Sequence, residues 1–106
     1  MRMWLLTLCA LALTANLCVA AGQPSADRGK ELFNNTSLGT NGKSCASCHS
    51  RGAGLDDASA YDTEKLKMIT NQCIIKSLEG SPLPLGSPDL VSLVMYLKSL
   101  ATTAAQ

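Results

Sequence analysis

The sequence has few aromatic residues, few charges and no run of charge of one sign. Its aromatic fraction is 4%, and its nine Lys and Arg residues nearly balance its eight Asp and Glu residues. Nucleic-acid-binding domains carry a basic patch or stripe, so this balance excludes that function. The 106 residues are enough for one domain, and the alternation of apolar and polar residues expected of a strand is absent. The sequence therefore predicts a single all-α domain.

Apolar residues are concentrated at the start of the chain. Arg2 gives a short basic beginning, residues 3–13 form a nearly unbroken apolar run, and the segment ends in two alanines at Ala21. This layout is typical of a secretory signal peptide cleaved after one of those alanines, and an uncleaved anchor is the alternative. Polar residues interrupt the segment, which makes it marginal against the roughly 20 apolar residues that a membrane span needs. We predict a signal peptide at 1–21 and a mature domain at 22–106 that lies in the periplasm and does not span the membrane.

Cysteine is the most informative residue type. Two of the five cysteines leave with the signal peptide, and the mature chain keeps Cys45, Cys48 and Cys73. An odd number of cysteines in an exported protein leaves one thiol outside any set of paired disulfides. We therefore expect at least one of the three to serve another chemistry.

That chemistry is indicated at residues 45–49, Cys-Ala-Ser-Cys-His. Two cysteines three positions apart can both form thioethers with the vinyl groups of a haem, and the histidine that follows can reach the iron from the same side. The motif predicts one covalent haem c, with Cys45 and Cys48 as its attachment points and His49 as the proximal iron ligand.

Three other interpretations of the motif were weighed. A thioredoxin-type redox pair would need a neighbouring strand, and residues 40–50 do not resemble one. A zinc site could use Cys45, Cys48, His49 and Cys73, but adjacent Cys and His do not match the usual ligand spacing. A structural disulfide between Cys45 and Cys48 would leave His49 without a role.

His49 is the only histidine in the chain. Once it binds iron, no second imidazole remains as a sixth ligand or as a general base. Catalysis by a Ser-His-Asp or Cys-His arrangement is excluded for the same reason, because each needs a histidine that is not bound to iron. We therefore predict a protein that is not an enzyme in its own right.

Helix-capping residues divide the rest of the chain. A first helix is expected over 24–34 with Ser25 as its N-cap, and another over 64–78 capped by Asp62 or Thr63. Pro88 at a first helical position opens a last helix that runs to about residue 100. Its expected buried stripe comprises Leu90, Leu93, Val94, Leu97 and either Leu100 or Ala101. Residues 35–42 and 50–59 are expected to be loops.

Three segments together resemble a small class I c-type cytochrome: Gly-Lys-Glu-Leu-Phe at 29–33, the motif at 45–49, and Leu-Val-Met-Tyr-Leu-Lys-Ser-Leu at 93–100. The resemblance implies three to four short helices around one haem, with the N- and C-terminal helices crossing. It also implies that Gly29 and Phe33 meet Tyr96. Such cytochromes usually place a methionine before the last helix as the sixth iron ligand, and residues 79–89 contain none.

The sixth ligand is therefore sought elsewhere. Met68 and Cys73 lie five residues apart, which puts them about 140° apart around a helix, so only one can face the haem. Cys73 is the first choice and Met68 the second. Asn71 is a weaker candidate on a different face. Met95 is a minor candidate that is expected instead to pack in the core, and an open position, a water-filled position or another group is the remaining alternative.

Residues 68–88 are similar to the haem domains of periplasmic thiosulfate dehydrogenases and of cytochrome subunits in sulfur-oxidising complexes. In those families a downstream cysteine can be the axial ligand, which would place that role on Cys73. The predicted function is a monohaem electron carrier that docks transiently to a periplasmic redox protein or enzyme. The alternative is a haem subunit of a thiosulfate- or sulfite-oxidising enzyme in which Cys73 takes part in sulfur chemistry.

Overall fold

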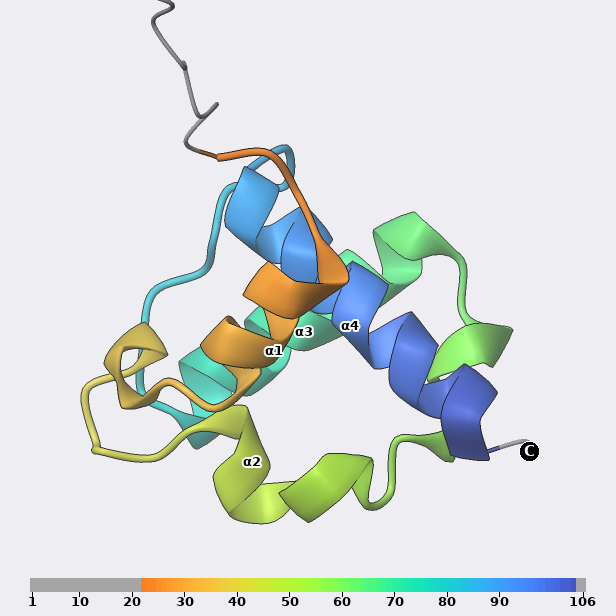
Figure 1. Ribbon diagram of the computed structural model, residues 1–106. Helices are drawn as coiled ribbons and strands as arrows, with labels where there is room; N and C mark the ends of the chain where they lie inside the picture. Colours follow the sequence, from red (N-terminus) through yellow and green to blue (C-terminus); the bar gives the residue numbers. More distant parts are fainter. Residues whose placement is uncertain (1–21, 105–106) are drawn as a thin grey trace, which may run out of the picture.

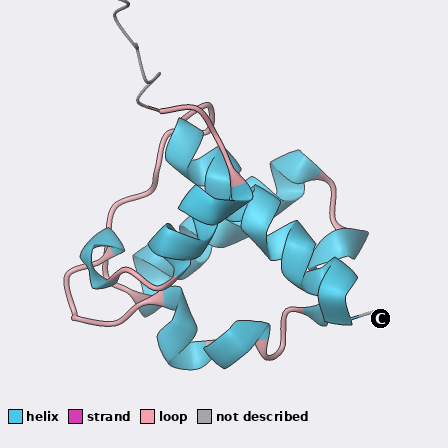
Figure 2. Ribbon diagram, viewed as in Figure 1, coloured by secondary structure: helices cyan, strands magenta, loops and turns pink. Residues whose placement is uncertain are grey.

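The computed structural model describes residues 22–104, and its side chains through residue 101. The predicted signal peptide at 1–21 lies outside this part of the chain. Figure 1 shows the four α-helices, which are α1 (Ala26–Phe33), α2 (Cys45–Cys48), α3 (Thr63–Ser77) and α4 (Pro88–Ala104). Residues 22–104 contain no strand, which confirms the all-α prediction (Figure 2). Within the same residues, no helix combines the length and apolar character needed to cross a bilayer.

The helices α1 and α4 cross in close backbone contact. A Cβ atom added at Gly29 would overlap the carbonyl group of Ser92 and the Cβ of Tyr96, so only glycine fits there. The rings of Phe33 and Tyr96 lie edge to face with their centroids 5.2 Å apart. Gly29 and Phe33 therefore both meet Tyr96, as the resemblance implied.

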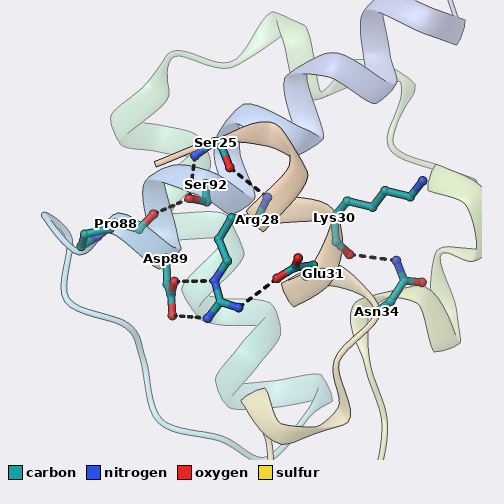
Figure 3. Close-up of polar contacts among 8 residues, drawn as sticks. All are labelled: Ser25, Arg28, Lys30, Glu31, Asn34, Pro88, Asp89 and Ser92. Atoms are coloured by element: carbon teal, nitrogen blue, oxygen red, sulfur yellow. Dashed lines mark hydrogen bonds and ion pairs between the residues drawn. The ribbon is translucent and has the colours of Figure 1, made fainter. Parts of the chain in front are cut away.

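Polar contacts also join α1 and α4 near the N-terminal ends of both helices (Figure 3). The backbone N–H of Ser25 donates to Ser92 Oγ at 3.1 Å, and Ser25 Oγ caps α1 by accepting from the N–H of Arg28 at 3.0 Å. The guanidinium of Arg28 donates to both carboxylate oxygens of Asp89, at 3.1 and 3.3 Å. Ser25 is thus the predicted N-cap, and it also links the two helices.

Asp62 rather than Thr63 caps α3, because its carboxylate accepts from the N–H of Lys65 at 2.8 Å. At the other end, the N–H of Gly80 donates to the carbonyl of Ile74 at 2.9 Å, which satisfies an orphan carbonyl of the last turn. The left-handed position of this turn is occupied by Glu79, with a φ of 54°. A non-glycine residue therefore adopts the strained conformation, one position before Gly80.

The core is built around α4, whose predicted stripe is confirmed. Leu90, Leu93, Val94, Leu97 and Ala101 are all buried, and Leu100 is partly buried. The helix continues to Ala104, beyond its predicted end at residue 100, because neither glycine nor proline follows to stop it. The expectation that Met95 packs in the core is wrong. Its side chain is 42% exposed, because it lies two residues from Leu93 and so on the opposite side of the helix.

Both segments expected to be loops contain single turns of 3₁₀ helix. These are η1 (Thr36–Leu38), η2 (Ser50–Gly52) and η3 (Asp56–Ala60). Turns this short have too few residues to show a period in the sequence. In Figure 1, α2 and the turns that follow it run along one side of the crossed helices, and α3 lies behind α1. The segment that holds the cysteine motif is thereby placed against the core.

Candidate cofactor site

The motif forms the one-turn helix α2. The backbone N–H of Ser44 donates to Ser47 Oγ at 2.9 Å, and the N–H of Ser47 donates to the carbonyl of Ser44 at 3.0 Å. These bonds fix the turn at its start. Because residues three apart lie on the same face of a helix, Cys45 and Cys48 project from one side of α2.

The imidazole of His49 is oriented by the backbone that follows it. Its Nδ1 atom lies 2.8 Å from the carbonyl oxygen of Ala53. A carbonyl can only accept a hydrogen bond, so Nδ1 carries the proton and Nε2 keeps its lone pair. Metal-binding histidines are commonly held in this way by the nitrogen that does not bind the metal. The tautomer required for an iron ligand is therefore already set by the protein.

A tight turn brings the Ala53 carbonyl to the ring. The N–H of Gly52 donates to the carbonyl of His49 at 2.9 Å, and that of Ala53 donates to the carbonyl of Ser50 at 3.0 Å. Arg51 and Gly52 both have positive φ, at 54° and 80°, which curls the chain back toward the imidazole. Arg51 is not a glycine, so the turn holds some backbone strain beside the site.

Both cysteines and His49 open into one largely apolar hollow, here named the cysteine pocket. Its walls come from all four helices and from the turn before η3. The lining residues are Phe33, Ser44, Cys45, Cys48, His49, Leu55, Cys73, Ser77, Leu78 and Leu97. The pocket therefore places two thiols and one imidazole at the edge of an apolar space.

Cys73 also reaches the cysteine pocket, from α3. Burial raises the pKa of the Cys45 thiol, and the nearby Cys73 thiol raises it further. Burial likewise raises the pKa of Cys73, with a further contribution from Cys48. The thiols of Cys45 and Cys73 therefore favour the protonated form when no metal is bound.

The other sulfur candidates lie outside the cysteine pocket. Met68 is 57% exposed, and Met95 is on the solvent side of α4. Asn71 is buried and already occupied: its amide donates to the carbonyl of Leu83 at 2.8 Å and accepts from the Leu83 N–H at 2.8 Å. Of the predicted candidates for the sixth ligand, the structure brings only Cys73 together with His49.

A second hollow, here named the α3 groove, lies on the outer face of α3. It is lined by Lys65, Met68, Ile69, Gln72, Cys73, Lys76 and Ser77. Cys73 and Ser77 border both hollows, so the groove and the cysteine pocket adjoin along one side of α3.

The donors of the cysteine pocket fit a haem c better than a bare metal ion. In residues 22–101, no three of the His, Cys, Asp and Glu side chains are grouped closely enough to hold a metal ion directly, so the four-ligand zinc cluster is not formed. Cys45, Cys48 and Cys73 are free thiols. Two thiols at the rim, one imidazole with a free Nε2 and an apolar interior match the needs of an attached porphyrin.

Several parts of the site were not visible in the sequence. The Ala53 carbonyl and the wall residue Leu55 lie in a segment expected to be a plain loop, and Ser47 had no assigned role. Of these, Ser47 had a signal: a Ser three residues after Ser44 is typical of reciprocal N-terminal capping.

A scan against protein-family models and searches of curated proteins and of solved structures found no match. The geometry of the site is therefore the basis for a functional assignment.

Proposed function

We propose that the protein is a monohaem c-type cytochrome of the class I type that carries single electrons in the periplasm. The observation that carries this proposal is the shared orientation of Cys45, Cys48 and His49. All three line one apolar pocket, and the His49 tautomer leaves Nε2 free.

Each residue of the motif has a distinct part. The thiols of Cys45 and Cys48 would each add across one vinyl group, with the thiol proton going to the vinyl carbon, and would hold the haem at one side of the pocket. His49 would supply Nε2 to the iron, and the hydrogen bond to the Ala53 carbonyl orients the imidazole for this role. The bound haem supplies a one-electron Fe(III)/Fe(II) couple. Phe33, Leu78 and Leu97 keep water from the interior.

For the sixth position we propose Cys73. It is the one predicted sulfur ligand that shares a pocket with His49, whereas Met68 lies on the outer face of α3. A thiolate donates negative charge and stabilises Fe(III), so the reduction potential should be low. Iron would also oppose the effect of burial on this thiol, because a bound cation lowers the pKa of its ligand.

Electron transfer would proceed through brief docking to a periplasmic redox protein or enzyme. Without residues 1–21 the chain loses Arg2, which leaves eight basic against eight acidic side chains. This balance of charge predicts weak long-range electrostatic steering between the protein and its redox partner.

One observation favours a second candidate, a haem subunit of a thiosulfate- or sulfite-oxidising enzyme. Cys73 borders the solvent-open α3 groove as well as the cysteine pocket, and Lys65 and Lys76 flank that groove. A small sulfur oxyanion could thus approach the thiol from outside. Turnover of thiosulfate by the isolated protein would favour this candidate over the electron carrier.

The experiment is expression of the full chain with haem-attachment machinery in an oxidising compartment, followed by mass spectrometry. We expect loss of residues 1–21 and a gain of about 616 Da for one haem attached through the two cysteines of the motif. The variant Cys45→Ser, Cys48→Ser is the control and should gain nothing. An unmodified mass for the wild-type chain would refute the proposal.

A further inference from the structure

Two lysines that make no ion pair within the described residues line the α3 groove. Lys65 and Lys76 are its charged lining residues, and no carboxylate lines it. Neither ammonium group forms an ion pair with any residue of 22–101, whereas Lys67 on the same helix is paired with Glu64 at 2.9 Å. A groove with unpaired cations and amide and hydroxyl donors is suited to an anionic group.

The proposed cofactor brings two such groups. A haem has an apolar ring with its vinyl groups on one side and two propionate carboxylates on another edge. The cysteine pocket suits the ring, and the adjoining groove suits the carboxylates. Because the two hollows share Cys73 and Ser77, one ligand can extend from the first into the second.

The thiols of the cysteine pocket indicate how a haem would be oriented relative to α3. Cys45 and Cys48 share the cysteine pocket with Cys73 and Ser77, which belong to the C-terminal half of α3. The vinyl side is therefore held near that half. A haem attached there and lying along α3 would direct its propionate edge toward the N-terminal half.

The two lysines lie on opposite sides of Cys73 along α3. Lys65 precedes Cys73 by eight residues, about 12 Å along the helix axis, in the direction away from the attachment side. Lys76 follows Cys73 by three residues, about 4.5 Å in the opposite direction. Lys65 and Lys76 thus lie at opposite ends of the groove. Their ammonium groups therefore cannot bind the same propionate edge equally well.

We propose that Lys65 is the propionate-binding residue of this protein, and that Lys76 is not. The inference rests on the proposed haem. Lys65 would then act as a positioning and charge-compensating residue. Removing its charge leaves a carboxylate uncompensated near the iron, which stabilises Fe(III) and lowers the reduction potential.

The test compares Lys65→Met, Lys65→Arg and the matched control Lys76→Met in the full, haem-loaded chain. Both lysines are exposed residues of one helix, so folding is preserved in all three variants, as circular dichroism would check. Mass spectrometry first establishes that haem is attached. Resonance Raman spectroscopy then follows the propionate bending vibration, and a redox titration follows the potential.

We expect Lys65→Met to shift the propionate vibration and lower the potential, Lys65→Arg to restore both, and Lys76→Met to leave the vibration unchanged. An unchanged vibration in Lys65→Met would overturn the inference, as would an equal shift in Lys76→Met. Either result would assign the groove to anions from solution or from a partner. A wild-type chain without haem would instead refute the proposed function, so the two failures are distinguishable.

Discussion

The buried amide of Asn71 makes two hydrogen bonds to the backbone of Leu83, both 2.8 Å long. It ties α3 to the segment before α4, which contains no methionine. This pair of bonds, here named the Asn71 clamp, therefore holds the segment that closes the domain through hydrogen bonds to its backbone.

The first prediction concerns this clamp. Asn71→Ala should lower the free energy of unfolding by about 2–4 kcal/mol, because it removes two hydrogen bonds and leaves the Leu83 N–H and carbonyl unpaired. Urea denaturation of the haem-loaded protein would measure the change. Asn71→Asp keeps the acceptor for the Leu83 N–H but sets a buried carboxylate oxygen against the Leu83 carbonyl, so near neutral pH it should cost at least as much as Asn71→Ala. Equal stability of Asn71→Ala and the wild type would show that water replaces the clamp.

The second prediction concerns the helix crossing. Gly29→Ala should destabilise the protein by about 1–3 kcal/mol, because its Cβ would overlap the Ser92 carbonyl and the helices would have to separate. Gly86→Ala is the matched control, since a Cβ there meets nothing within 4 Å and its φ is not positive. That variant should be neutral or slightly stabilising. Thermal unfolding of the two variants side by side would check the contrast.

The third prediction concerns the end of α3. Glu79 adopts a φ of 54°, a region that glycine occupies without strain. Glu79→Gly should therefore raise the free energy of unfolding by about 1 kcal/mol. Glu79→Ala keeps the strain and should bring no gain. A stabilised alanine variant would attribute the effect to loss of the carboxylate instead.

The fourth prediction concerns pH in the haem-free chain. Burial raises the pKa of Cys45 and Cys73 above the ordinary 9.0, so the folded state keeps protons that the unfolded state loses. The thiol contribution to stability is present below pH 9 and is lost as the pH rises through the folded-state pKa. Urea unfolding at pH 7 and pH 10 should show the decline. A variant with Ser at both positions should show a smaller one.

The local signals of the sequence predicted α1, α3 and α4, because helix starts depend on neighbouring residues. Ser25, Asp62 and Pro88 mark helix starts by hydrogen bonding or by a fixed φ within one turn of the chain. The spacing of Cys45, Cys48 and His49 likewise fixes their common side of α2. None of these features requires knowledge of the tertiary fold.

What the sequence left open depends on contacts across the fold. Cys73 lies at the border between the buried and exposed faces of α3, so periodicity alone could not assign it to the cysteine pocket. The Asn71 clamp and the Ala53 carbonyl both join segments whose approach is set by packing. Met95 was misplaced because its neighbours in the sequence are core residues, although its direction from α4 is opposite to theirs.

The last prediction tests the proposed iron ligand. Cys73→Met keeps a sulfur donor on the same turn of α3 but replaces a thiolate with a neutral thioether, so the haem should stay six-coordinate while its reduction potential rises. The ferric spectrum should change from a low-spin thiolate type to one with a band near ~695 nm, the usual mark of methionine ligation. Optical and low-temperature EPR spectra, with a redox titration, would measure both effects. Met68→Leu should keep the thiolate-type spectrum, because Met68 does not line the cysteine pocket in which His49 lies. Met95→Leu is the control for both measurements, because Met95 is exposed on α4 and lines neither hollow. An unchanged potential and spectrum in Cys73→Met would remove Cys73 from the iron, and loss of the wild-type spectrum in Met68→Leu would transfer the role to Met68.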